Sequence, residues 1–155
     1  MAGCKADVKD NIFFSKDDNE VIYPCGHNVI VYHLEEKNQR YIPCIEGTEG
    51  ITAMALHSSG KWLAVAERTE KTPVVAIYNL GHKDLKRQRV ICSTEIHKQK
   101  EFTAMAFYPR EDKKLLATLT SMPEQCVYIW SWDKGRYFSE QQLNNSTHSF
   151  GTQIS

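Results

Sequence analysis

The sequence has no excess charge of either sign and no long apolar run. Its 19 lysines and arginines balance its 19 aspartates and glutamates, so the formal net charge is zero. A nucleic-acid-binding domain is expected to be strongly basic, so nucleic acid is not an expected partner. No apolar run reaches the roughly 18 residues that a membrane-spanning helix needs. Residues 1–9 lack the apolar region of a signal peptide, and we therefore expect no membrane partner and a cytoplasmic location.

Motifs that support catalysis or bind metals and cofactors are also missing. The sequence contains no HExxH, no P-loop, no GxSxG and no dinucleotide-binding glycine motif. The five cysteines have no CxxC spacing and are odd in number, which favours free thiols. Cys25 and His27 could form half of a metal site or a nucleophile pair, but a hairpin turn explains them better. We expect neither enzymatic activity nor a cofactor.

A segment that occurs twice is the strongest positive feature of the chain. The sequence ITAMAL at residues 51–56 recurs as FTAMAF at residues 102–107, with four of the six positions identical. Two further pairs of segments match at nearly the same spacing: residues 61–66 with 114–119, and residues 74–78 with 126–130. A period of about 50 residues is typical of propellers, solenoids and arrays.

Each repeat contains four short apolar segments that have the features of β-strands. They are rich in β-branched and aromatic residues and are bounded by Gly, Pro, Ser, Asn or Asp. Several are apolar on both faces, as in LAVA at residues 63–66, so both faces of the sheet should be covered. A stack of four-stranded antiparallel sheets meets that requirement, and this is the architecture of a β-propeller. We predict an all-β partial propeller of three blades, at about residues 11–45, 51–96 and 102–140.

Three blades are too few to close a ring, because propellers have about four to eight. An open ring exposes sheet faces and strand edges, which favours association. We therefore expect a fragment, a truncated product, or an arc that another subunit or the remainder of the propeller completes. Residues 1–10 are predicted to be an N-terminal extension. Residues 141–155 are polar and out of phase with the repeat, and we expect them to be a disordered tail.

An aromatic residue followed by a polar one closes the third predicted strand of each repeat. The pairs are Tyr32-His33, Tyr78-Asn79 and Trp130-Ser131, and a literal Trp132-Asp133 comes two residues after the last. This pattern resembles the WD-repeat family, although the family's Gly-His dipeptide is absent before the two TAMA segments. The longer text between residues 11 and 138, including NIFF, VIYPCG and PVVAIY, is similar to the start of ciliary WD-repeat proteins.

That resemblance implies a non-catalytic protein–protein interaction scaffold of the ciliary or flagellar axoneme. It further implies two N-terminal propellers followed by a long coiled coil, and a role in assembling or regulating inner dynein arms and hence in motility. The implied partners are axonemal or cytoskeletal proteins, such as dynein-arm or tubulin-associated components. Two alternatives stay open: a WD-repeat scaffold of another cytoplasmic or microtubule-associated complex, and a small β-sheet enzyme or ligand-binding barrel.

The strongest charge feature is the segment at residues 82–89, which holds two lysines and two arginines against one aspartate. It could attract an acidic partner such as tubulin through long-range electrostatics, or it could be a solvated loop between the third and fourth strands. Among the tryptophans, Trp62 and Trp130 fall on predicted strands, and Trp132 is expected to be the most exposed. The candidate partner-binding residues are Lys83, Lys86, Arg87, Arg89 and Trp132.

Overall fold

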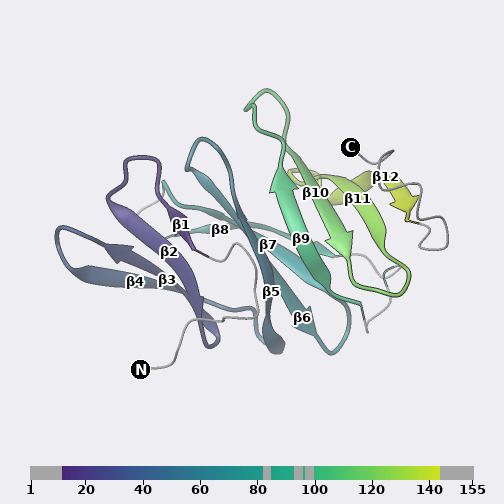
Figure 1. The fold of residues 1–155 in the computed structure, drawn as a ribbon, viewed down its shortest axis with the longest axis horizontal. Coiled ribbons are helices and arrows are strands. Elements are labelled where there is room, and N and C mark those ends of the chain that lie inside the picture. Colours follow the sequence, from purple (N-terminus) through teal and green to yellow (C-terminus); the bar gives the residue numbers. More distant parts are fainter. Residues whose placement is uncertain (1–11, 82–84, 93–95, 97–99, 144–155) are drawn as a thin grey trace.

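The computed structural model describes residues 12–81, 85–92, 96 and 100–143 of the chain. These residues form three four-stranded antiparallel sheets, each of which runs through consecutive strands (Figure 1). The first sheet contains β1 (Phe13–Phe14), β2 (Glu20–Cys25), β3 (Asn28–His33) and β4 (Asn38–Pro43). The second contains β5 (Thr48–Leu56), β6 (Trp62–Thr69), β7 (Val74–Asn79) and β8 (Arg87–Cys92). The third contains β9 (Phe102–Phe107), β10 (Leu115–Thr120), β11 (Cys126–Ser131) and β12 (Arg136–Gln142).

The three sheets lie side by side in chain order and form an open arc (Figure 1). The predicted all-β architecture of three four-stranded antiparallel units without ring closure is therefore confirmed. The strands belong to three separate sheets. The alternative of a ligand-binding barrel, in which one sheet closes on itself, is therefore excluded. In the described part of the chain, no helix is long and apolar enough to cross a membrane.

One strand extends into the segment that was expected to be a disordered tail. Gln141 and Gln142 continue β12, because their backbones pair with Val127 and Cys126 of β11. The remainder of the predicted tail, from residue 144, lies outside the described residues, as does the predicted extension at residues 1–10.

The inner strands β6 and β7 of the middle sheet are buried on both faces, as the uninterrupted apolar pattern of β6 predicts. Leu63 and Val65 pack toward the first sheet, in a core with Ile22 and Val31. The alanines between and after them face the third sheet instead. Because successive strand residues point to opposite faces, an apolar run without alternation fits only a sheet that is covered twice.

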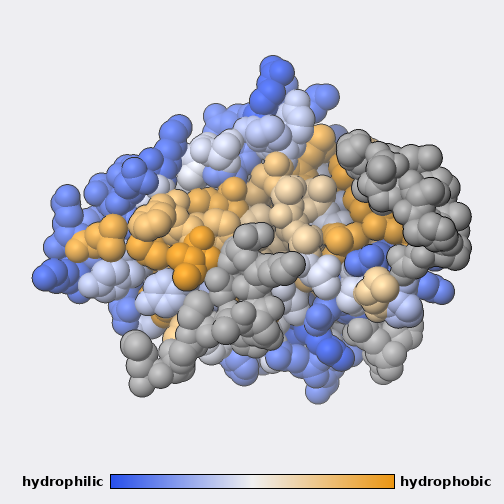
Figure 2. Space-filling view, viewed as in Figure 1, coloured by the Kyte–Doolittle hydropathy of each residue, from blue (hydrophilic) through white to orange (hydrophobic). Residues whose placement is uncertain are grey.

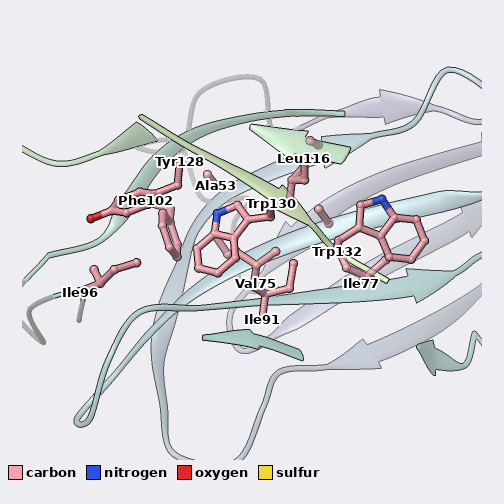
Figure 3. Close-up of a cluster of buried hydrophobic side chains, with 13 residues drawn as sticks. Ala53, Val75, Ile77, Ile91, Ile96, Phe102, Leu116, Tyr128, Trp130 and Trp132 are labelled. Carbon is pink, nitrogen blue, oxygen red and sulfur yellow. The ribbon is translucent and has the colours of Figure 1, made fainter. Parts of the chain in front are cut away.

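The core between the second and third sheets combines small residues with large ones. Alanines of β5 and β6 leave space, and aromatic rings of the third sheet fill it. Figure 3 shows the rings of Phe102 and Trp130 next to one another, with Trp130 directed toward Val75 of the second sheet. These two rings pack edge to face, with centroids 6.4 Å apart. The complementarity of alanine and aromatic surfaces fixes how closely these two sheets approach.

A buried hydrogen bond joins two neighbouring strands inside that core. The indole nitrogen Nε1 of Trp130 donates to the hydroxyl Oγ1 of Thr118 at 2.8 Å. Trp130 is only 1% exposed, so its N–H depends on this single acceptor for its hydrogen bond. The bond ties β11 to β10 independently of the backbone ladder.

A buried carboxylate holds the connection between the first and second sheets. Glu67 is 1% exposed, and both of its carboxylate oxygens accept from the backbone N–H of Ile45, at 3.0 and 3.3 Å. Desolvation raises the pKa of Glu67 above its ordinary value, although hydrogen bonds from Thr48, Ile45 and Cys44 act in the opposite direction. Glu67 thus anchors the segment between β4 and β5.

Candidate partner-binding surface

The predicted basic segment is divided between a connection and a strand. β8 begins at Arg87, so Arg87 and Arg89 are strand residues, and the expected solvated loop ends before them. Lys86 precedes the strand, and its carbonyl accepts from the backbone N–H of Asn79 at 2.9 Å. Lys83 lies outside the described residues. Arg87 and Arg89 therefore lie in a strand and not in the solvated loop that was considered for the basic segment.

A β-bulge places the two arginines on opposite faces of the second sheet. Tyr78 of β7 pairs with Arg87 and the adjacent Ile77 pairs with Arg89, so Gln88 is an extra residue in β8. Neighbouring residues of β7 point to opposite faces, and their partners follow them. Tyr78 belongs to the core toward the first sheet, and Ile77 belongs to the core toward the third.

Arg89 connects the second sheet to the third. Its guanidinium Nη2 donates to the backbone carbonyl of Asp133, in the turn between β11 and β12. The side chain also lies against Gly135 of the same turn. The charge remains exposed, but the side chain is held by a contact within the molecule.

Lys86 and Arg87 line a hollow on the other side of the second sheet, which we call the Arg87 hollow. Its volume is about 310 Å³. The residues around it come from β4, the connection after β4, β7 and the approach to β8, and include Tyr41, Pro43, Tyr78, Lys86 and Arg87. The lining also contains Glu46, so two basic side chains and one acidic side chain meet the exposed ring of Tyr41 here.

The hydroxyl of Tyr78 stays protonated in this hollow. Burial raises the pKa of Tyr78 to about 12, and the nearby Glu67 carboxylate also raises it, while Arg87 lowers it. Glu67 also experiences the positive charge of Arg87, which lowers the pKa of that carboxyl. The attraction of Arg87 only partly offsets the desolvation of Glu67, so the pKa of that carboxyl stays raised.

The prediction that Trp132 is exposed is wrong. The indole is 5% exposed and packs against Trp62, with ring centroids 5.0 Å apart. The backbone N–H of Trp132 donates to the carbonyl of Lys114 at 3.0 Å, so the strand pairing continues one residue past β11. Tyr128, Trp130 and Trp132 consequently point to the same face, into the core between the second and third sheets.

Sequence reasoning missed a second group of basic residues around these two indoles. Lys61, Lys113 and Lys114 surround Trp62 and Trp132 at the boundary between the second and third sheets. The repeat itself carried the signal, because Lys61 and Lys114 begin the matched segments at residues 61–66 and 114–119. Equivalent positions of adjacent units lie side by side in a stacked array.

Among the residues that the structure describes, the Ser, His and Cys side chains considered as candidates for catalysis lie in or next to turns. Ser59 Oγ lies 2.8 Å from Nδ1 of His57, but this nitrogen also accepts from the backbone N–H of Ser59 at 3.0 Å. The pair therefore closes the turn between β5 and β6. Cys25 and His27 flank the turn residue Gly26, whose φ is 61°. In the parts of the chain that are described, no group of three or more His, Cys, Asp or Glu could hold a metal ion.

Comparison with known sequences gives one family and several relatives. Residues 11–153 match the family described as the CFAP43 N-terminal domain. Cilia- and flagella-associated protein 57 of Mus musculus is 33% identical over 132 residues, which are 85% of this chain and 10% of that protein. Cilia- and flagella-associated protein 43 of Mus musculus is 28% identical over 123 residues, or 79% of this chain and 7% of that protein. The chain thus spans about a tenth of these relatives or less.

Comparison with solved structures confirms the propeller architecture. A chain in the crystal structure of a mitotic checkpoint complex superposes with a TM-score of 0.67 at 12% identity, over 92% of this chain and 40% of that chain. The β-propeller domain of Cps50 (Swd1) from Myceliophteria thermophila superposes with a TM-score of 0.63 at 13% identity, over 92% of this chain and 41% of that chain. At such low identity the likeness concerns the fold alone.

Proposed function

Since the chain belongs to the CFAP43 N-terminal domain family, we propose that it is part of a non-catalytic protein–protein interaction scaffold of cilia and flagella, located at the axoneme. The family match over residues 11–153 carries the proposal. The names of the two murine relatives, both cilia- and flagella-associated proteins, support it. We further propose that the scaffold assembles or regulates inner dynein arms and so contributes to motility, with dynein-arm or tubulin-associated proteins as its partners.

The mechanism of such a scaffold is geometric. Apolar cores on both sides of the second sheet hold the three sheets in fixed relative positions. The turns and sheet edges then present side chains that do not need to be ordered when a partner binds, which lowers the entropic cost of association. Conformational change and bond chemistry have no part in this mechanism.

Within this scaffold we assign partner contact to Lys86 and Arg87 of the Arg87 hollow, and to Lys83 in the same stretch of sequence. The hollow joins positive charge to the exposed ring of Tyr41, a combination common in protein interfaces. Arg89 contributes through the contact it makes with the turn at Asp133, and Trp132 through the packing of the third sheet. Arg89 and Trp132 therefore contribute by holding the second and third sheets together and not by contacting the partner.

Fluorescent tagging of the protein at its natural locus in a ciliated cell tests the location. The proposal expects a signal along the axoneme that remains after detergent removes the ciliary membrane. A protein that is absent from axonemes would overturn the proposal and would favour a WD-repeat scaffold of another cytoplasmic or microtubule-associated complex.

The dynein-arm role has a separate test. Disruption of the locus should reduce the occupancy of inner dynein arms in axonemes imaged by electron tomography, and should lower the ciliary beat frequency. Normal inner arms together with normal beating would remove this role while leaving the axonemal location intact.

A further inference from the structure

A second hollow lies where the second and third sheets meet, on the edge of the arc that carries the β5–β6 and β9–β10 turns. Its volume is about 210 Å³. We call it the Lys–Trp hollow, and its main lining residues are Lys61, Trp62, Glu111, Lys113, Lys114 and Trp132. The volume is below the roughly 300–1,000 Å³ typical of small-molecule pockets, and it suits one or two side chains of a bound polypeptide.

Two indole rings form the apolar part of this hollow, and ammonium groups lie over them. Lys114 Nζ is 5.1 Å from the ring centroids of both Trp62 and Trp132. Lys61 Nζ is 4.9 Å from the centroid of Trp62. Cation–π attraction at these distances holds the ammonium groups near the rings, and each ammonium has three N–H donors to offer.

The positive charge of the Lys–Trp hollow is not neutralised from within. The described ion pairs are Arg40 with Glu20, Arg68 with Glu49, and Arg110 with Asp112. None of the three lysines takes part in an ion pair with a described residue. Among the described lining residues, Glu111 is the only carboxylate, against three lysines. A local excess of positive charge in a chain with no net charge favours an anionic partner at this hollow.

The two walls of the hollow are fixed relative to one another. Ser58 Oγ, in the β5–β6 turn, donates to the carbonyl of Pro109, in the β9–β10 turn, at 2.6 Å. Trp62 and Trp132 are in ring contact across the same boundary, and Phe107 packs on Trp132 with centroids 6.3 Å apart. The packing of the sheets therefore fixes the indole rings and the backbone positions of the three lysines, while the lysine side chains themselves remain exposed.

From these observations we propose that the Lys–Trp hollow binds a carboxylate-rich segment of a partner protein. Glutamate and aspartate carry a carboxylate on an apolar stem, and this matches ammonium donors arranged above indole rings. The proposal rests on the scaffold function proposed above and adds the chemistry of one partner segment. It differs from the Arg87 hollow in position, because it lies on the opposite side of the second sheet.

Binding of a fluorescein-labelled poly-glutamate peptide to the 155-residue chain, followed by fluorescence anisotropy, tests the site. The test variant carries K61Q, K113Q and K114Q together. The matched control carries K37Q, K71Q and K134Q, which remove the same charge from exposed positions elsewhere. We expect the test variant to bind roughly tenfold more weakly and the control to bind like the parent chain. Raising the salt from about 0.1 M to about 0.5 M should weaken binding by the parent chain.

Three results would overturn the proposal. Equal weakening in the test and control variants would mean attraction by overall charge. Displacement of the peptide by an equal concentration of inorganic phosphate would mean a general anion site. No binding by a parent chain that unfolds cooperatively would mean no site. Retention of the axonemal signal in any of these cases would leave the scaffold function standing, whereas loss of that signal with intact peptide binding would overturn the function and not the site.

Discussion

The indole N–H of Trp130 and the hydroxyl of Thr118 form a buried pair in which each group depends on the other. Both residues are buried, and no other described residue accepts a hydrogen bond from this nitrogen. Removing one partner of a buried hydrogen bond leaves the other polar group buried with neither a protein partner nor water to bond to, which costs free energy. The pair is therefore a residue-scale determinant of how the third sheet is held together.

Thr118→Val tests this pair, because valine keeps the shape of threonine and removes the acceptor. The free energy of unfolding should fall by about 1–3 kcal/mol, measured by urea denaturation. Thr103→Val is the control: its hydroxyl donates to Leu119 at an exposed position, and its loss should change stability by less than about 0.5 kcal/mol. Equal effects of the two substitutions would contradict the role of the buried bond.

Glu67 makes stability depend on pH in the direction opposite to that of an ion-paired carboxylate. Its pKa in the folded chain is raised above the ordinary value of 4.5, so the folded state binds a proton more tightly than the unfolded state. Above the raised pKa, the buried negative charge reduces stability. As the pH falls through the raised pKa toward 4.5, Glu67 becomes protonated in the folded chain, and the stability that its buried charge removed is regained.

Glu67→Gln keeps an oxygen for the N–H of Ile45 and removes the charge. Compared with the parent chain, we expect this variant to be relatively more stable at pH 8 than at pH 5, as measured by paired urea titrations. The difference between the two chains isolates Glu67 from the other titrating groups. A stability difference that does not change with pH would contradict the raised pKa.

At the scale of the element, β8 shows how a one-residue bulge separates two similar side chains. Arg87 and Arg89 are two positions apart, so a regular strand would place them on one face. The extra residue Gln88 directs Arg87 to the first sheet and Arg89 to the third. The sequence carries no signal for this bulge, since the register of β8 depends on its pairing with β7.

Arg87→Gln and Arg89→Gln should therefore differ in effect. Arg89→Gln removes the contact with the carbonyl of Asp133 and should lower the free energy of unfolding by about 0.5–1 kcal/mol, because the contact is exposed. Arg87→Gln removes a weak attraction to Glu67 and Tyr78, so it should lower the free energy of unfolding less than Arg89→Gln does, while it weakens partner binding. Urea denaturation of the two variants under identical conditions gives the comparison. Equal losses of stability would contradict the different roles assigned to Arg87 and Arg89.

The strands themselves were largely predictable, and the orientation of particular side chains was not. The repeated TAMA segments identify the units. The LAVA segment in β6, which is apolar on both faces, identifies the buried middle sheet. Trp132 was predicted to be exposed because it follows the third strand of its unit. Trp132 is two residues after Trp130 and four after Tyr128, and this alternation would place all three rings on the same buried face if the strand continued. The hydrogen bond from the backbone of Trp132 to Lys114 shows that it does continue.

At the scale of the whole molecule, the arc ends in surfaces that carry exposed apolar side chains. Phe14 is 60% exposed and Tyr41 is 55% exposed, both on the first sheet. Figure 2 shows a band of hydrophobic residues along the molecule, with hydrophilic residues on either side. Monomeric proteins seldom expose such surface without a partner for it.

We expect the 155-residue chain alone to associate as its concentration rises, which light scattering after size-exclusion chromatography would detect. Phe14→Ser should reduce this association, because it removes apolar area at the end of the arc. Phe138→Ser, which removes another exposed ring on the third sheet, shows whether both ends contribute. A chain that stays monomeric at all concentrations and melts cooperatively would contradict the open-arc account.

The two faces of the second sheet pack in different cores, and this difference limits how the order and number of the units can change. One face offers alanines that receive aromatic rings, and the other offers Leu63 and Val65 to the aliphatic side chains of the first sheet. A neighbour that fits one face would leave voids or clash on the other. The three units are therefore not interchangeable, and a duplicated or reordered unit would need new interfacial residues before it could be accommodated.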